Sequence, residues 1–303
     1  MTKSGMRSAS ILLVLFIGVG AAAHAQAGFG GPWGHEPRLE VFAMFDKDNN
    51  GRLNDREMQS ARNHVRELRG NESLPEHIRF YLPVTLGLLG DIRKSAASAP
   101  KDRADLYDEN TFRTLYLRFS SPGWFDELTD FFNTDVEVPA NLIVDGEAYP
   151  GVGVHFRGSS SYFMTRNSPK KSFNISIDYE KGSQRLYGYR TLNLLNNNAD
   201  PSFLREVLFS RISHSYIPAL KANFVKLVIN GENWGVYTSV EQFNNDFLSE
   251  WFGTSGGVRW KIPPGRSGPG ALFYNGPDPE DYKSSFELQT DDSPGAWYSL
   301  IEL

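Results

Sequence analysis

The chain contains no cysteine, so neither a disulfide bond nor a thiolate metal site can stabilise it. It has no Lys/Arg-rich run, and its formal net charge is −5. A nucleic-acid partner is therefore not expected, because proteins that bind nucleic acids present a basic surface. His-Glu-x-x-His and Walker-type lysine loops are also absent, which removes the common signatures of zinc proteases and P-loop NTPases. Ser159–Ser161 lack the Gly-x-Ser-x-Gly frame of an α/β-hydrolase elbow.

The composition is that of an ordinary globular protein with room for more than one domain. The chain has 303 residues, of which 40% are hydrophobic and 22% charged. Aromatic residues make up 13%, which indicates a packed core that includes strands. Without disulfides, the folded state must be stabilised by this core and by any metal ion that it binds.

The N-terminal residues 1–25 have the pattern of a secretory signal peptide. Lys3 and Arg7 precede an apolar run over 11–23, and Ala23-His24-Ala25 provides a cleavage site of small residues. The alternative is a membrane anchor, but the run is shorter than the ~20 residues that a spanning helix needs. We therefore expect a secreted protein (extracellular, periplasmic or at the cell surface) with no transmembrane segment after cleavage.

Residues 46–57 have the spacing of a calcium-binding EF-hand loop. Gly51 stands where such a loop turns sharply. Calcium prefers six to eight oxygen ligands, and this spacing supplies side-chain, backbone and water-mediated oxygens from one short segment. The six predicted metal ligands occupy loop positions 1, 3, 5, 7, 9 and 12: Asp46, Asp48, Asn50, Arg52 (through its carbonyl), Asn54 and Glu57.

The flanks of this loop have helical apolar spacing, and the segment 42–48 resembles calmodulin-type EF-hands. The alternative is a polar Asp/Asn/Gly turn that joins two helices without metal. EF-hands usually occur in pairs, and no second loop of this pattern is present. A single hand is therefore expected to bury its apolar face on another domain or on a partner protein.

The pattern divides the mature chain into three parts. Residues 26–70 form the EF-hand region, residues 71–105 a connecting segment and linker, and residues 106–303 a second domain. Strands are predicted at 111–119, 141–144, 152–157, 172–179, 224–229 and 236–240, with helices near 124–132, after Asp200-Pro201, and at 243–252. Asn230-Gly231 predicts a tight hairpin turn.

Three features of the second domain fit a nucleotide site. A small-residue turn, Arg157-Gly158-Ser159-Ser160-Ser161, follows one strand. Lys171 opens the next strand on the same face as Phe173 and Ile175, and Glu206 lies on the following helix. Kinases use a Gly-rich loop, a strand lysine and a helix glutamate to hold ATP phosphates. Spacing alone favours the simpler explanation, since Gly-Ser turns are common and most lysines are solvated.

Residues 106–303 resemble the CotH (spore coat protein H) kinase family. The motifs that carry the resemblance are Val152-Gly153-Val154-His155-Phe156-Arg157-Gly158, Lys170-Lys171-Ser172-Phe173, Asp200-Pro201-Ser202-Phe203-Leu204-Arg205-Glu206, Asn230-Gly231-Glu232-Asn233-Trp234-Gly235, Glu241-Gln242-Phe243 and Arg259-Trp260-Lys261. The family is similar to protein kinases in fold, is often secreted, and has members that phosphorylate proteins with ATP and a divalent metal.

The resemblance implies an α+β fold: an N-terminal EF-hand helix-loop-helix, then a protein-kinase-like N-lobe (an antiparallel sheet with a helix), with a C-terminal lobe that is truncated. The cofactors implied are Ca2+ and ATP with Mg2+, and the partner is a protein substrate. By position, Gly158, Ser159, Ser160 and Ser161 would form the phosphate loop, Lys171 would contact phosphates, Glu206 would orient Lys171, and Glu241 would lie near the nucleotide hinge. Lys261 matches a family lysine of unassigned role.

Neither His-Arg-Asp nor Asp-Phe-Gly occurs in the chain, so no catalytic residue is assigned. The family's catalytic aspartates lie further toward the C-terminus than this chain reaches. We therefore expect an ATP-binding, kinase-like protein that transfers phosphate only in a full-length form. The alternative is a non-catalytic, calcium-stabilised surface, spore-coat or matrix binding protein.

Overall fold

The computed structural model describes residues 38–69, 104–165, 168–262, 274–283, 285–290 and 294–302. They belong to two compact units, one within residues 37–247 and one that contains the described residues from 248 onward. The predicted signal peptide at 1–25, the lead-in before residue 38 and most of the connecting segment at 71–105 lie outside the described residues.

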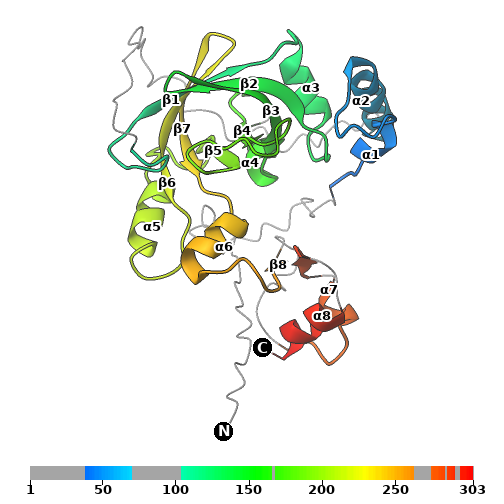
Figure 1. The fold of residues 1–303 in the computed structure, drawn as a ribbon, viewed down its shortest axis with the longest axis vertical. Helices are drawn as coiled ribbons and strands as arrows, with labels where there is room; N and C mark the ends of the chain where they lie inside the picture. The colour runs from blue at the N-terminus through cyan, green and yellow to red at the C-terminus, as the bar shows by residue number, and fades with distance from the viewer. Residues whose placement is uncertain are drawn as a thin grey trace. The chain divides into compact units, whose positions relative to one another are not determined.

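Seven strands of the larger unit close into a barrel in the order β1-β2-β3-β4-β5-β7-β6 (Figure 1). The strands are β1 Arg113–Arg118, β2 Val138–Val144, β3 Glu147–Arg157, β4 Ser172–Ser176, β5 Thr191–Leu195, β6 Ala222–Ile229 and β7 Glu232–Val240. The helices of this unit are α1 Phe42–Phe45, α2 Asp55–Arg69, α3 Trp124–Asp130, α4 Ser160–Met164 and α5 Arg205–Ser213, followed by α6 Asn245–Phe252.

Alternation of apolar residues along the strands builds the barrel interior. The predicted inward face of β4 is confirmed, because Phe173, Ile175 and Ile177 are fully buried. Phe173 contacts Tyr237 of β7 across the interior, at 6.0 Å between ring centroids. Each large apolar side chain that is buried in this way contributes about 1.5–3 kcal/mol, so the interior is the main source of stability in a chain without disulfides.

The predicted fold, an α+β chain with a kinase-like N-lobe of antiparallel sheet and helix, is wrong. The barrel is a closed mixed sheet, because β1 pairs in parallel with β6 from Arg113–Val225 to Leu117–Ile229. Every other neighbouring pair is antiparallel, and the β6–β7 hairpin at Asn230-Gly231 is confirmed. Turn residues reveal hairpins, but they give no sign of a pairing between strands more than a hundred residues apart.

The segment before β1 closes one end of the barrel. Leu106 is 1% exposed and belongs to the barrel core. The buried guanidinium of Arg113 donates hydrogen bonds to the carbonyls of Ala104 (2.6 Å), Asp105 (2.9 Å) and Leu106 (3.0 Å), and to the Asp145 carboxylate (2.8 Å). One strand side chain therefore fixes the whole segment.

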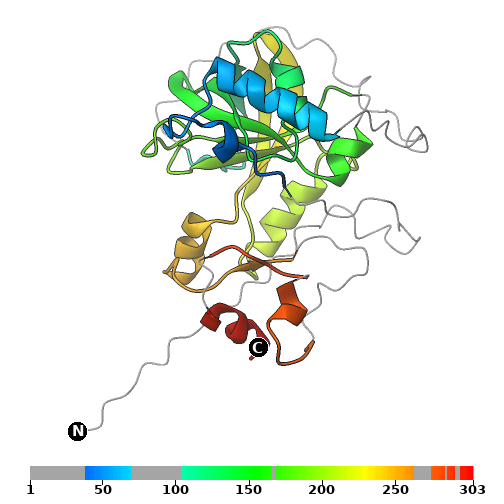
Figure 2. The ribbon, with the colours of Figure 1, turned by 90° about the vertical axis from the view of Figure 1, so that its right-hand side faces the viewer.

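Helices α1 and α2 pack on the outside of the barrel beside α3 (Figures 1 and 2). Asp130 at the end of α3 accepts hydrogen bonds from Arg62 (2.7 Å) and Arg66 (2.7 Å). Ala61 and Val65 are fully buried in the same core as the barrel. The apolar face of this single helix pair is thus covered by the chain's own barrel.

The smaller unit holds α6 in part, then β8 Trp260–Lys261, α7 Glu280–Lys283, β9 Glu287–Leu288 and α8 Pro294–Ile301. Strands β8 and β9 pair antiparallel. None of the helices in the described part of the chain has the length and apolarity to cross a membrane.

We expect Arg113→Met to lower the free energy of unfolding by about 3–5 kcal/mol, because it leaves three carbonyls, one buried and two part-buried, and the Asp145 carboxylate without their donor. Urea denaturation would measure this loss. Arg118→Met on the same strand is the control, since Arg118 is exposed, and should change the value by less than about 0.5 kcal/mol. Equal effects of the two substitutions would contradict this role of Arg113.

Candidate functional site

The small-residue turn after β3 requires glycine at its first position. Gly158 has φ +84°, and a Cβ atom there would lie 2.3 Å from Oγ of Ser161. Both the backbone conformation and this close approach exclude larger residues. Ser159 occupies the N-cap position of the short helix α4 without a side-chain capping hydrogen bond, and Gly158, Ser159, Ser160 and Ser161 follow the end of β3 beside the start of β4.

Lys171 points inward, as predicted, and is 4% exposed. Its Nζ donates hydrogen bonds to the carbonyls of Thr165 (2.6 Å) and Tyr162 (3.2 Å), and lies 4.6 Å from the Tyr162 ring centroid. These carbonyls lie at the C-terminal end of α4, where a positive charge is favoured. The buried ammonium therefore has strong interactions within the protein itself.

Lys170 lies in a different environment, which the sequence did not reveal. Its Nζ donates to the Val236 carbonyl (2.8 Å) and lies 4.8 Å from the Phe203 ring centroid and 5.0 Å from that of Tyr237. Burial lowers the pKa of Lys170 to about 8. The adjacent lysines thus have different surroundings. Strand alternation identified Lys171 as the inward lysine, whereas the aromatic rings near Lys170 come from segments distant in the sequence.

Glu206 lies in the first turn of α5, close enough to Arg157 for their charges to interact. Burial raises the pKa of Glu206, and Arg157 opposes this rise. Burial likewise lowers the pKa of Arg157 to about 10, and Glu206 opposes that shift. The charged neighbour that acts on Glu206 is therefore Arg157. The predicted orientation of Lys171 by Glu206 stays a prediction.

Glu241 lies at the far end of these strands from Lys171, because it follows β7 whereas Lys171 precedes β4 and the strands alternate in direction. It is 3% exposed, and its Oε2 accepts a hydrogen bond from the backbone N–H of Lys221 (3.1 Å). The structure brings the Gly158 turn, Lys171 and Lys170 together, and it places Glu241 elsewhere. A hinge role for Glu241 is not tested by this placement.

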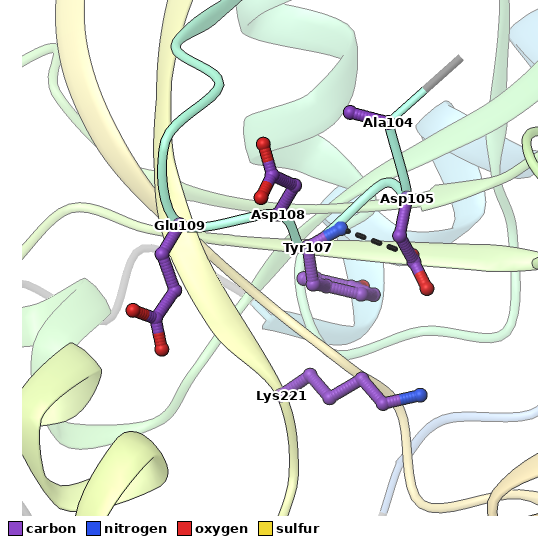
Figure 3. A pocket seen from close by; sticks show the side chains of 6 residues that line it. All are labelled: Ala104, Asp105, Tyr107, Asp108, Glu109 and Lys221. Carbon is purple, nitrogen blue, oxygen red and sulfur yellow. Dashed lines mark hydrogen bonds between the residues drawn. The ribbon is translucent and has the colours of Figure 1, made fainter. Parts of the chain in front are cut away.

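A hollow of about 320 Å³ lies at the Glu241 end of the barrel (Figure 3). Lys221 extends beneath Tyr107, whereas Glu109 points away from them (Figure 3) and forms an ion pair with Arg211 (3.0 Å). Burial raises the pKa of Tyr107 well above its usual value. The residues that line the hollow are Ala104, Asp105, Tyr107, Asp108, Glu109 and Lys221.

The predicted calcium loop joins α1 to α2 and is organised by its own carboxylates. Asp46 is 8% exposed, and its oxygens accept hydrogen bonds from the backbone N–H groups of Asn50 (3.1 Å) and Gly51 (2.9 Å). Glu57 is 9% exposed and accepts from the N–H groups of Lys47 (3.2 Å) and Asn54 (3.0 Å). The first and last predicted ligands thus shape the loop from both ends.

The donor set fits a hard cation in kind, since Asp46, Asp48, Asn50, Arg52, Asn54 and Glu57 all supply oxygen. Across the described ranges, however, no three or more His, Cys, Asp or Glu side chains are grouped so that they could hold a metal ion. The structure shows two helices, α1 and α2, joined by this loop, and calcium binding by the loop stays a proposal.

Lys261 of the family-like motif lies in the smaller unit. Its Nζ forms an ion pair with Glu287 (3.1 Å) across the β8–β9 pair. This contact gives Lys261 a local structural partner.

We expect the free energy of unfolding to increase between pH 7.5 and 9.5 by more in the wild type than in Lys170→Met. Lys170 loses its proton at about pH 8 when folded, against 10.5 ordinarily, so the unfolded chain binds more protons over this interval and stability rises with pH. Urea denaturation at both pH values measures the difference. Lys181→Met, at an exposed lysine, should follow the wild type. An identical pH response of Lys170→Met and wild type would refute the burial of this ammonium.

Comparison with known proteins found a family model that matches the part of the chain holding the Gly158 turn and Lys171. Residues 154–297 match the family model described as CotH kinase protein. The match includes the Gly158 turn, both lysines, Glu206 and Glu241, and it excludes the helix pair that carries the predicted calcium loop. No curated protein matches the chain. Residues 154–297 are therefore similar to the CotH family.

Proposed function

We propose that this chain is the nucleotide-binding part of a secreted CotH-family protein that, in its full-length form, transfers phosphate from ATP with Mg2+ to a protein substrate. The observation that carries the proposal is that Arg157 and Lys170 lie on the two segments that flank the Gly158 turn, inside the region that matches the CotH model. Phosphoryl transfer depends mainly on positioning and on neutralising phosphate charge, and such a cation-rich turn suits both tasks.

The turn and its cations support nucleotide binding in complementary ways. Gly158 lets the backbone bend sharply beside β4, and a glycine turn allows backbone N–H groups to approach phosphate oxygens closely. The half-buried cations around it would then neutralise the phosphate charges. Secretion belongs to the same proposal and rests on the signal-peptide pattern of residues 1–25.

A second candidate is a non-catalytic binding protein that keeps the CotH fold. The hydrogen bonds from Lys171 to the Thr165 and Tyr162 carbonyls favour it, because they give this lysine a structural role without a nucleotide. Nucleotide binding separates the two candidates.

We expect the full chain to bind ATP in the presence of Mg2+, measured by isothermal titration calorimetry. Gly158→Val should weaken this binding at least tenfold, because valine does not tolerate φ +84° and its Cβ would meet Ser161. Gly182→Val is the matched control, since a Cβ at Gly182 meets no atom within 4 Å. Absence of ATP binding by the wild type would favour the non-catalytic protein.

Calcium is proposed as a stabilising ligand of the loop at residues 46–57. At calcium concentrations about 100-fold above Kd, binding should stabilise the folded chain by about 2.7 kcal/mol, or raise Tm by about 5–10 °C. Glu57→Gln should abolish this shift, whereas Asp55→Asn should keep it, because Asp55 lies outside the predicted ligand positions. An unchanged calcium response in Glu57→Gln, measured by thermal melting, would refute the ligand assignment.

A further inference from the structure

We propose that Arg157 and Lys170, rather than Lys171, contact the phosphate groups of the bound nucleotide. This inference rests on the proposed function and assigns a phosphate subsite within it. The ligand chemistry is a chain of phosphates, whether it belongs to ATP or to free inorganic triphosphate.

Arg157 and Lys170 lie beside the same turn. Arg157 is the last residue of β3 and pairs with Ser172, two residues after Lys170. The segment that starts α5 also reaches both cations, because the Phe203 ring lies 4.8 Å from Lys170 Nζ and the Glu206 carboxylate interacts with Arg157. Arg157 at the end of β3 and Lys170 just before β4 are therefore both close to the segment that starts α5.

The guanidinium of Arg157 is half-buried, yet within the described part of the chain it makes no hydrogen bond and no ion pair closer than 4.0 Å. A guanidinium has five N–H donors, and burial without acceptors is costly. Phosphate oxygens are the acceptors that its planar, two-pronged geometry fits best. The nearby Glu206 carboxylate opposes the lowering of the Arg157 pKa by burial.

Lys170 and Lys171 differ in the number of hydrogen bonds that their ammonium groups donate to backbone carbonyls. Lys171 donates to two carbonyls and is 4% exposed. Lys170 donates to one carbonyl, that of Val236, and its remaining contacts are aromatic rings. Burial alone depresses the pKa of Lys170, with no carboxylate acting against it. An ammonium in this state gains most from an incoming anion.

The experiment compares four variants of the 303-residue chain with the wild-type chain. Each is titrated calorimetrically with ATP and Mg2+ and, separately, with inorganic triphosphate. Lys170→Met and Arg157→Met should each weaken binding of both ligands at least tenfold, as expected for the loss of a charge-assisted contact of about 1.5–3 kcal/mol. Lys171→Met should change affinity less than threefold. Arg118→Met is the exposed-arginine control and should bind as the wild type does.

Thermal melting of the same variants separates binding from folding. Lys170→Met should lower Tm less than Lys171→Met does, because only the Val236 carbonyl loses its donor and the removal of a partly buried charge opposes that loss. Lys171→Met should lower Tm, because the carbonyls of Thr165 and Tyr162 lose their donor.

Each outcome decides something different. Loss of binding in Lys171→Met, with Lys170→Met and Arg157→Met unchanged, overturns this inference and leaves the proposed function standing. Failure of the wild type to bind either ligand overturns both. Binding of inorganic triphosphate without ATP overturns the proposed function and supports the phosphate subsite, provided that Lys170→Met and Arg157→Met lose it.

Discussion

The parallel pairing of β1 with β6 is the constraint on which the larger unit depends. A sheet with free edges needs some other cover for its unpaired backbone groups, and closure removes both edges at once. The register shifts at Ala140/Leu142 and Leu227/Val228 mark irregularities that bend the strands toward closure. The antiparallel pairing of β3 with β4 places the end of β3 beside the start of β4, with Arg157 and Lys170 at that end of the pair.

Local signals predicted the parts of this fold better than their assembly. The hairpin at Asn230-Gly231, the alternation of Phe173, Ile175 and Ile177, and helix α3 follow from turn chemistry and periodicity. The closed barrel does not follow from these local signals, because no local turn connects β1 to β6, the two strands whose pairing closes it. Helix α5 shows the same limit. A helix after Asp200-Pro201 was predicted, yet its apolar residues Leu208 and Ile212 are 46% and 61% exposed, since tertiary packing decides which face is buried.

In the candidate site, too, local sequence patterns predicted some features and missed those that depend on contacts between distant segments. Strand alternation correctly placed Lys171 inside, but its observed hydrogen-bond partners are the carbonyls of Tyr162 and Thr165 at the end of α4. Whether a carbonyl, a carboxylate or a phosphate satisfies an ammonium depends on contacts between segments that sequence spacing does not encode. Lys170 was overlooked for that reason, since Val236, Phe203 and Tyr237 come from two other elements. Glu241 shared a motif series with Lys171, yet it lies at the opposite end of the strands.

The central claim is that phosphates bind at Arg157 and Lys170. The most direct measurement is a crystal structure of the full chain with Mg2+ and a non-hydrolysable ATP analogue. The account predicts phosphate oxygens within hydrogen-bond distance of Lys170 Nζ and the Arg157 guanidinium, with Lys171 still bonded to the Thr165 carbonyl. Phosphates on Lys171, with Lys170 still bonded to Val236 and Arg157 without a ligand, would contradict it.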